Sequence, residues 1–302
     1  MLDTVIIGAG PAGLSAAVYA RRAGLNALLI EDSPVYGGQV LSTYEVDNYL
    51  GLPGVSGIEL SEKFSSHAKS AGIDTVSDRV VKIEKNGEFK KVVCESDSYD
   101  TKTVIVATGA LHAHLNVPGE EELAGMGVSY CATCDGAFFK DCDVCVIGGS
   151  DVAVEDAIYL SRTCRHVFLI HRRDSLRAAQ SLINVLAKCA NVSFLWDSEV
   201  VSFNGEEELT SVTIHNKKTE VDSTIDVQGA FVAVGIKPMT DFLGLMVEKD
   251  AGGYIVAGED CRTSERGIYV AGDIRRKPMR QIITAVADGA NAASSVSEDI
   301  RG

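Results

Sequence analysis

Cys131 and Cys134 are separated by two residues, and Asp135 follows the second of them directly. Two thiols at this spacing can close a disulfide within one turn of the chain, so that one thiolate attacks a disulfide and the other resolves the mixed product. The adjacent carboxyl group can supply or remove a proton during the exchange. The stretch Ser129–Gly136 therefore predicts two-electron thiol–disulfide chemistry, with these two cysteines and Asp135 as candidate catalytic residues.

The thiol pair lies between two glycine-rich turns, of which the first is GAGPAG at residues 8–13. A short apolar strand, Thr4–Ile7, runs into this turn, and a helix from Leu14 to about Ala23 follows it. A second strand, Ala27–Ile30, comes next. Strand, turn, helix and strand in this order predict a βαβ unit of the kind that binds dinucleotides.

The residues of this first turn have the types that a dinucleotide site requires. Gly8 permits the tight turn, Gly10 lets the backbone approach a pyrophosphate, and Gly13 lets the helix pack closely on the strand. Glu31, at the end of the second strand, can accept hydrogen bonds from a ribose diol and would repel a 2′-phosphate. These features favour a site for FAD over the alternative, a glycine-rich turn without a ligand.

The second turn, residues 148–153, repeats the first, and Val167–Ile170 repeats the second strand. The repeat ends differently, because His171-Arg172-Arg173 stands where the first copy has an acid, and Arg177 follows nearby. Guanidinium groups suit a 2′-phosphate through bidentate, charge-assisted contacts. The second turn therefore predicts a site for NADPH rather than NADH, and the alternative is a basic strand end that only faces solvent.

The repeat predicts the architecture of the whole chain. We expect an α/β fold of two Rossmann-like dinucleotide-binding domains, each a three-layer ββα arrangement, with the second inserted in the first. The FAD-binding domain would comprise residues 1–114 and 245–302, and the NADPH-binding domain, residues 115–244, would carry the redox CxxC pair. The chain would return to the first domain and end in a helix that begins near Gln281.

Several further segments of the first domain can be assigned from their patterns. We expect a flexible turn at Gly37–Val40, able to lie close to a flat ligand, a polar loop at Ser42–Asn48 and an amphipathic helix at Leu60–Ala71. Three alternating stretches between residues 79 and 102 predict an antiparallel meander. Thr103–Gly109 is expected as a separate buried strand.

Composition limits the possible functions of the chain. Of 302 residues, 46% are hydrophobic, which is enough for two substantial cores. The net charge of −14 argues against a nucleic-acid surface, which needs clustered Lys and Arg. No run approaches the roughly 20 apolar residues that span a bilayer. The first strand begins too early for a signal peptide, so we expect a cytoplasmic protein with mostly reduced thiols.

A second CxxC, Cys142 to Cys145, raises zinc as an alternative, because paired CxxC motifs can hold this metal. Cys145, however, falls within the apolar strand that leads into the second glycine turn, whereas zinc ligands usually lie on exposed turns. We therefore expect no metal site. The remaining cysteines are expected to be bystanders: Cys94, Cys164, Cys189 and Cys261.

Taken together, these motifs resemble the low-molecular-weight thioredoxin reductase family. The matching pieces occur in the family's order and span essentially the whole chain: GAGPAG (8–13), GGQ (37–39), ATGA (107–110), VPGEEE (117–122), CATCDG (131–136), HRRDSLRA (171–178), AGD (271–273) and RQIITA (280–285). The resemblance implies a homodimer that passes electrons from NADPH through FAD to a Cys131–Cys134 disulfide and on to thioredoxin. It also implies that the inserted domain swivels between two positions.

The resemblance implies a role for each matching residue. Cys131 would attack the thioredoxin disulfide, Cys134 would face the flavin, and Asp135 would be the general acid and base. The helix that begins near Gln281 would direct its positive end toward the flavin. The residues implied to bind FAD are Gly8, Gly10, Ala12, Gly13, Glu31, Gly37, Gly38, Gln39, Asn48, Ala107, Thr108, Gly109, Gly272, Asp273, Arg280, Gln281 and Ile282. Those implied to bind NADPH are Gly148, Gly149, Ser150, Asp151, His171, Arg172, Arg173 and Arg177.

Three residues depart from the family's pattern. Ser150 stands where the family usually has glycine, Val152 where it has a hydroxyl residue, and Ala113 where it has a basic one. Because a side chain at 150 lies where the backbone should meet the NADPH pyrophosphate, we expect weaker use of NADPH than in a glycine-bearing relative. Two alternatives stay open: a flavin disulfide reductase with another donor, such as ferredoxin, or another disulfide partner, and a flavin-bound redox sensor without turnover.

Overall fold

The computed structural model describes residues 1–43, 46 and 48–302. The chain forms two compact units: the first comprises residues 1–41, 49–111 and 237–302, and the second comprises residues 42–48 and 112–236. Apart from residues 42–48, the chain passes between the units at residues 111–112 and 236–237. The sequence analysis placed these two crossings at 114–115 and 244–245. The expected polar loop Ser42–Asn48 includes residues 44, 45 and 47, which lie outside the described residues.

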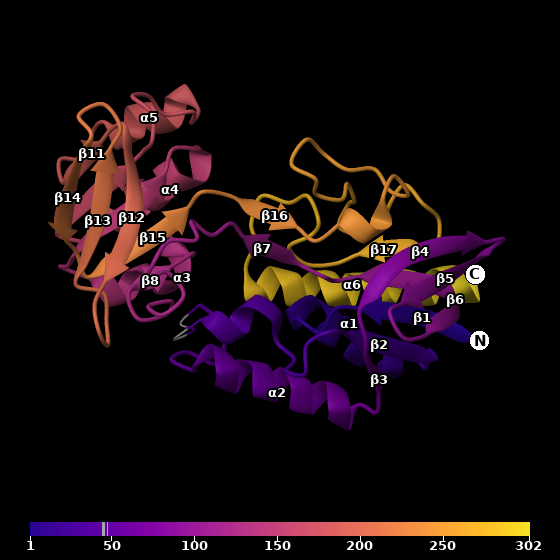
Figure 1. Cartoon of the computed structure of the whole chain (residues 1–302). Helices are drawn as coiled ribbons and strands as arrows, with labels where there is room; N and C mark the ends of the chain where they lie inside the picture. The colour runs from indigo at the N-terminus through magenta and orange to yellow at the C-terminus, as the bar shows by residue number, and fades with distance from the viewer. Residues whose placement is uncertain (44–45, 47) are drawn as a thin grey trace. The chain divides into compact units, whose positions relative to one another are not determined.

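The first unit is built on a mixed sheet with strand order β3-β2-β1-β6-β5-β4, in which β17 also pairs with β6 (Figure 1). Strands β1, β2, β3, β6 and β17 are parallel to one another, and β4 and β5 form the antiparallel part. The strands are β1 (Leu2–Ile7), β2 (Ala27–Glu31), β3 (Asp74–Ser77), β4 (Val80–Asn86), β5 (Phe89–Cys94), β6 (Ser98–Val106) and β17 (Ile268–Val270).

Strand β6 is continuous, which corrects the expectation of separate strands at residues 98–102 and 103–109. The strand changes partners along its length: Ser98–Thr101 pairs antiparallel with β5, and Val104–Val106 pairs parallel with β17. The second half is buried on both faces, whereas the first half is partly exposed. The change in hydrophobic pattern therefore marks a change of neighbours rather than a break in the strand.

Helices cover one face of this sheet. Ile6 and Ile105 point into a cluster with α1 (Pro11–Arg22) and α6 (Ile282–Arg301), which lie side by side (Figure 1). The opposite face, with Val5 and Val104, packs against residues of β4 and β5 and of the segments near residues 243–257. The remaining short elements are η1 (Gly38–Ser42), α2 (Gly57–Ser70), β7 (Ala110–His112), β16 (Ile236–Pro238) and η3 (Asp241–Leu243).

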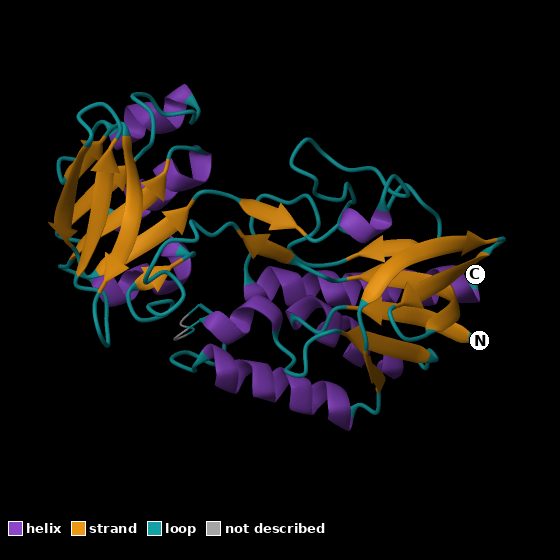
Figure 2. Ribbon diagram, in the orientation of Figure 1, coloured by secondary structure: helices purple, strands orange, loops and turns teal. Residues whose placement is uncertain are grey.

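The second unit repeats this plan with a five-stranded parallel sheet of order β11-β10-β9-β15-β8 (Figure 2). A separate antiparallel sheet has the order β12-β13-β14. The elements are β8 (Val128–Ser129), α3 (Ala132–Asp135), η2 (Gly136–Phe139), β9 (Asp143–Gly148), α4 (Asp151–Leu160), β10 (His166–Ile170), α5 (Gln180–Leu186), β11 (Val192–Leu195), β12 (Ser198–Asn204), β13 (Ser211–Asn216), β14 (Val221–Asp226) and β15 (Gly229–Ala233).

Alternate residues of β9 reach the two outer layers of the second unit. Val144 and Val146 pack against α4, whereas Cys145 and Ile147 face the antiparallel sheet, where Phe203 and Val212 lie. The second unit therefore has three layers, with the parallel sheet between helices and the antiparallel sheet. Within the described part of the chain, no helix combines the length and the apolar character needed to cross a membrane.

In the first unit, α1 and α6 approach each other closely through small residues. A Cβ added at Gly289 would lie 2.1 Å from the backbone oxygen of Ala12 and 2.9 Å from the side chain of Ser15. The hydroxyl of Ser15 also donates a hydrogen bond of 2.7 Å to the carbonyl of Val286. Position 289 thus has no room for a side chain, and the spacing of the two helices depends on glycine there.

We predict that Gly289→Ala destabilises the protein by about 1–3 kcal/mol, because the added methyl group must push α1 and α6 apart. The measurement is the free energy of unfolding in urea, compared with Asn291→Ala at an exposed position of the same helix. The control should change the free energy by less than about 0.5 kcal/mol. Equal stabilities of wild type and Gly289→Ala would contradict the close packing of these helices.

Candidate active site

Cys131 and Cys134 are joined by a disulfide, with their Cα atoms 5.3 Å apart. The bond spans the first turn of α3, because Cys131 precedes this helix and its carbonyl accepts hydrogen bonds from the amides of Cys134 and Asp135 at 3.2 and 3.1 Å. Both cysteines are half-buried. A disulfide at the start of a short helix, partly open to solvent, can be reached by a second disulfide.

Asp135 is held beneath this turn by Ser129, a residue to which the sequence analysis gave no role. The Ser129 hydroxyl donates a hydrogen bond of 2.6 Å to Asp135 Oδ2 and accepts one of 3.1 Å from the amide of Cys131. Burial raises the pKa of Asp135, and the hydrogen bond from Ser129 offsets part of this rise. A serine two residues before the first cysteine of a CxxC motif is the signal that could have indicated such a bridge.

The other cysteines do not form a cluster with the disulfide. Cys142 is half-buried and Cys145 is buried in β9, where burial raises the pKa of its thiol. Within the described residues, no group of three or more His, Cys, Asp or Glu is arranged to hold a metal ion. The two CxxC motifs therefore differ in kind: the first is a partly exposed disulfide, and the second ends in a core residue.

The first glycine turn lies at the carboxyl ends of β1 and β6. A Cβ on Gly8, whose φ is +102°, would lie 2.6 Å from the carbonyl oxygen of Ala107, and a Cβ on Gly13 would lie 1.8 Å from that of Gly8. Gly10 is different, because the nearest atom to a Cβ there would be the oxygen of Gly37 at 4.0 Å. Close contacts within the protein thus require glycine at positions 8 and 13. No such contact exists at Gly10, which leaves open space beside the turn.

Polar groups from the neighbouring segments gather around this turn. The Glu31 carboxylate accepts hydrogen bonds from the amides of Ala9 and Ser33. Burial raises the pKa of Glu31, and these two backbone hydrogen bonds partly offset the rise. The side-chain amide of Gln39 donates to the carbonyl of Ala110. The predicted residues of the GGQ and GAGPAG motifs therefore lie in one region of the first unit.

The turn Gly272-Asp273 follows β17 and brings a carboxylate to the same unit. Asp273 Oδ1 is buried without a hydrogen-bond partner among the described residues, and the nearest cation, Lys277, is 3.8 Å away. Burial raises the pKa of Asp273, against the opposing charges of Lys277 and Arg280. A buried oxygen without a partner is costly, so Oδ1 is suited to a hydroxyl group of a ligand.

Asp288 of α6, which the sequence analysis did not select, organises this turn. Its carboxylate accepts hydrogen bonds from the amide of Gly272 at 3.0 Å, from Arg275 at 2.8 and 3.1 Å, and from Lys277 at 3.0 Å. Burial alone would raise the pKa of Asp288, but Arg275 and Lys277 hold it below its usual value. An acid in the middle of a stretch of small residues, 285–295, was the available signal.

The second glycine turn has the same position in the second unit. A Cβ on Gly148 would lie 2.5 Å from the carbonyl oxygen of Ala233, and one on Gly149 would lie 2.3–2.6 Å from the His171 ring. Ser150 begins α4 in an extended conformation open to any residue, and its hydroxyl does not cap the helix. Asp151 accepts a hydrogen bond of 2.7 Å from the amide of Ala179.

Three arginines surround the end of β10. The amide of Arg177 donates a hydrogen bond of 2.8 Å to the carbonyl of Gly149, which folds the basic segment back over the glycine turn. Burial lowers the pKa of His171, and the charges of Arg177, Arg172 and Arg173 lower it further. The arginine side chains are exposed, and none forms an ion pair within the described chain. The cluster is therefore available for an anion.

The predicted site residues divide between the units. Those of the GAGPAG, GGQ, ATG and AGD motifs, together with Arg280, Gln281 and Ile282, belong to the first unit. The redox pair, the second turn and the basic segment belong to the second. Asn48, which was expected to bind FAD, is grouped with the second unit. Each motif is thus assembled locally within its own unit.

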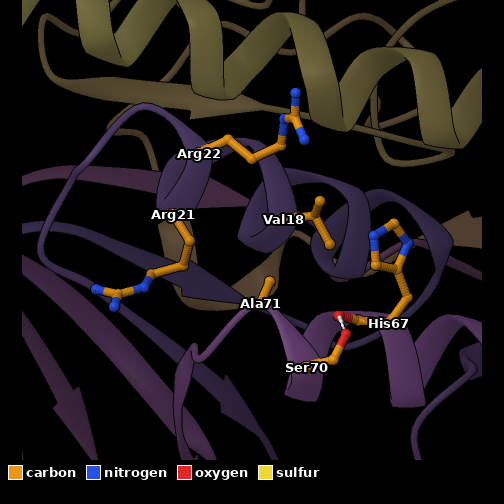
Figure 3. Close-up of a pocket in the computed structure, with 6 residues that line it drawn as sticks. All are labelled: Val18, Arg21, Arg22, His67, Ser70 and Ala71. Atoms are coloured by element: carbon orange, nitrogen blue, oxygen red, sulfur yellow. Dashed lines mark hydrogen bonds between the residues drawn. The ribbon is translucent and has the colours of Figure 1, made fainter.

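A cavity of about 310 Å³ in the first unit does not involve any of these motifs. It lies between α1 and α2, where the side chains of Arg21 and Arg22 extend from α1 and the hydroxyl of Ser70 donates to the carbonyl of His67 (Figure 3). The residues that line it are Val18, Arg21, Arg22, His67, Ser70 and Ala71.

Comparisons with known proteins agree with this arrangement. A family model described as pyridine nucleotide-disulphide oxidoreductase matches residues 2–289. A thioredoxin reductase from Listeria innocua is 44% identical over 98% of this chain and 93% of its own length, and one from Bacillus subtilis is 42% identical over 97% and 93%. The solved thioredoxin reductase from Streptococcus pyogenes is 43% identical with a TM-score of 0.95, covering 100% of this chain and 98% of its own.

The chain belongs to the thioredoxin reductases of the pyridine nucleotide-disulphide oxidoreductase family. The resemblance inferred from the motifs is therefore confirmed, as is the α/β fold class with two Rossmann-like domains. Membership makes the chain an oxidoreductase that uses a flavin and a nicotinamide nucleotide. The disulfide between Cys131 and Cys134 fits the redox-active disulfide of such an enzyme.

We predict that Cys131→Ser and Cys134→Ser each abolish disulfide reductase activity, because both thiols are needed to close the disulfide. Oxidised wild type should show two fewer reactive thiols than reduced protein, and neither variant should show this difference. Cys142→Ser, at a half-buried cysteine of the same unit, is the matched control and should keep at least half the activity. Loss of activity in the control together with bound zinc would favour a metal site.

Proposed function

We propose that this chain is a thioredoxin-disulfide reductase, in which electrons pass from NADPH through FAD to the Cys131–Cys134 disulfide and on to the disulfide of a thioredoxin. The observation that carries the proposal is the half-buried disulfide followed directly by Asp135, one of whose carboxyl oxygens is buried. The relatives named thioredoxin reductase support the choice of partner. We also propose a homodimer, as the motif resemblance implies, and a cytoplasmic location, where the free cysteines would stay reduced.

FAD fits the residues of the first unit. Gly10 leaves open space at the turn, as the approach of a pyrophosphate requires, and Asp273 Oδ1 is a buried acceptor that a hydroxyl of the ribityl chain could satisfy. The proposed FAD residues remain those of the sequence prediction that lie in this unit, from Gly8 to Ile282. When bound, the flavin would accept a hydride and deliver two electrons to the disulfide.

NADPH fits the second unit by charge. The exposed guanidinium groups of Arg172, Arg173 and Arg177 surround the end of β10, and bidentate contacts from such groups suit a 2′-phosphate. The lack of a Cβ at Gly148 and Gly149 lets this turn pack against the Ala233 carbonyl and the His171 ring. The side chain of Ser150 weakens the site because it takes up space where the backbone should meet the pyrophosphate. It does not close the site, because its hydroxyl can itself donate to a phosphate oxygen.

The chemistry assigned to the chain's own residues follows from the geometry of α3. Cys131 opens the helix and is proposed as the thiol that attacks the partner disulfide, with Cys134 as the thiol that closes the Cys131–Cys134 bond again. Asp135 is proposed as the acid and base, because burial keeps its pKa above the ordinary value and so permits proton exchange nearer neutral pH.

We predict that Gly10→Ala yields folded protein that has lost at least about 90% of its flavin. The methyl group meets no protein atom closer than 4.0 Å but would occupy the space that the pyrophosphate needs. The measurements are flavin absorbance per protein and the free energy of unfolding of the apoprotein, which should change by less than about 0.5 kcal/mol. Gly13→Ala should instead fail to fold stably, and a fully yellow Gly10→Ala would contradict the FAD site.

We predict that Arg172→Ala combined with Arg173→Ala raises the Michaelis constant for NADPH at least tenfold and leaves that for NADH unchanged. A tenfold change corresponds to about 1.4 kcal/mol of lost phosphate contacts. Ser150→Gly should lower the constant for NADPH, and Arg162→Ala, at an exposed arginine without an ion pair in the described chain, should change neither. The measurement is anaerobic reduction of the flavin by each nucleotide.

One outcome of the same titration would change the assignment of the electron donor. If wild-type flavin stays oxidised at millimolar NADPH and is reduced by ferredoxin, the NADPH assignment is wrong and the enzyme takes its electrons from an iron–sulfur protein.

A further inference from the structure

Ser129 connects three parts of the redox centre. It lies on β8, the edge strand of the parallel sheet, where it pairs with Phe231 of β15 and is only 5% exposed. Its hydroxyl donates to Asp135 Oδ2 at 2.6 Å and accepts from the amide of Cys131 at 3.1 Å. The carbonyl of Cys131, at 3.4 Å, is a weaker competing acceptor. The serine therefore joins the rigid sheet to both ends of the CxxC-acid segment.

The two oxygens of the Asp135 carboxyl group therefore differ in their hydrogen bonding. Oδ2 is occupied by the hydrogen bond from Ser129, whereas Oδ1 is buried and has no hydrogen-bond partner in the part of the chain that the structure describes. A buried polar atom without a partner is costly unless a function requires it. Oδ1 is thus the atom of Asp135 that remains able to take up and release a proton.

We propose that Ser129 is a positioning residue for proton transfer at the Cys131–Cys134 disulfide: it fixes Oδ2 of Asp135 and so leaves Oδ1 to exchange a proton with the thiols. This inference deepens the proposed function and rests on it. It assigns Ser129 no contact with a substrate, and its effect on the reaction passes entirely through Asp135.

The step balances in atoms and electrons. The Cys131 thiolate attacks one sulfur of the partner disulfide, so that a Cys131–partner bond forms, the partner S–S bond breaks and a partner thiolate leaves. Protonated Asp135 gives its proton to that thiolate and then takes the proton of the Cys134 thiol. The Cys134 thiolate displaces the second partner sulfur from Cys131 and closes the disulfide, and Asp135 gives the proton that it took from Cys134 to this second partner thiolate. Two electrons pass to the partner, and Asp135 is left as a carboxylate that takes one proton from solvent.

The effect of Asp135 on the pH profile must be distinguished from the effects of other titratable groups near α3. Strands β8 and β15 and the segment η2 carry none, but α4 packs against α3 and carries Asp151, Glu155, Asp156 and Tyr159. Burial and the neighbouring Glu155 raise the pKa of Asp156 to about 7. Asp156→Asn is therefore the control that removes this second acid without touching the Ser129–Asp135 hydrogen bond.

The experiment compares two small disulfides that differ in their need for a proton. The dithiol form of the holoenzyme is mixed with 2-hydroxyethyl disulfide, which releases an alkyl thiolate, or with 5,5′-dithiobis(2-nitrobenzoate), which releases an aryl thiolate of low pKa that needs no protonation. Ser129→Ala should react about tenfold more slowly with the alkyl disulfide and within twofold of wild type with the aryl one. Ser129→Thr, which restores a hydroxyl, should recover most of the loss.

The pH profile gives a second readout. Because the Ser129 hydroxyl stabilises the carboxylate, its removal raises the pKa of Asp135, and the limb of the alkyl-disulfide profile that Asp135→Asn eliminates should move to higher pH in Ser129→Ala. That limb should be unchanged in Asp156→Asn. Equal loss with both disulfides would show damage to the CxxC turn itself, and an unchanged alkyl rate would show that Ser129 has no role. Either result overturns the inference.

A separate assay distinguishes failure of the proposed function. Wild type is assayed for NADPH-dependent reduction of thioredoxin, and absence of turnover would overturn the function. The single-turnover comparison needs neither thioredoxin nor NADPH and still decides whether Ser129 positions Asp135.

Discussion

A backbone carbonyl occupies the place of a side chain at the first glycine of each nucleotide turn. The Ala107 oxygen lies 2.6 Å from where a Cβ on Gly8 would be, and the Ala233 oxygen lies 2.5 Å from the corresponding point at Gly148. Both glycines have positive φ. The chain can therefore leave the sheet between two neighbouring parallel strands only because no side chain is present. This constraint fixes where α1 and α4 begin and leaves the carboxyl edge of each sheet open to a ligand.

The same scaffold is then specialised by the residues at its rim. In the first unit the second strand ends in Glu31, whose carboxylate is held by two backbone amides beside the turn. In the second unit the equivalent strand, β10, is followed by His171, which lies amid three arginine charges. The two equivalent positions thus carry opposite charges without any change in topology, and guanidinium groups attract a 2′-phosphate whereas a carboxylate repels it.

The redox chemistry depends on a different kind of support. The Cys131–Cys134 disulfide lies on a helix of four residues, which has little stability of its own. Its position is fixed by contacts with β8, through Ser129, and with the apolar face of α4, against which Ala132 packs. In the first unit, Asp288 likewise holds the AGD turn through Gly272, Arg275 and Lys277. Short functional segments in both units are thus held by buried polar contacts from larger elements.

The sequence alone determined the features that depend on residues close together in the chain. Glycine turns flanked by apolar strands, the CxxC pair and the basic segment at 171–177 each carry their chemistry in a local pattern, so the βαβ units, the redox pair and the duplicated plan were predictable. The continuity of β6 was not, because its two halves have different patterns and only the order of strands in the sheet shows that one strand pairs with β5 and then with β17.

The roles of Ser129 and Asp288 were decided only by the tertiary structure. Neither residue is distinctive by type, and each acts on a partner that folding brings to it: Asp135 across the gap between β8 and α3, and Gly272 across the gap between α6 and β17. The physical reason is burial. A polar group acquires a strong preference for one partner when water is removed, and which groups lose their water together depends on the packing of whole elements rather than on spacing along the chain.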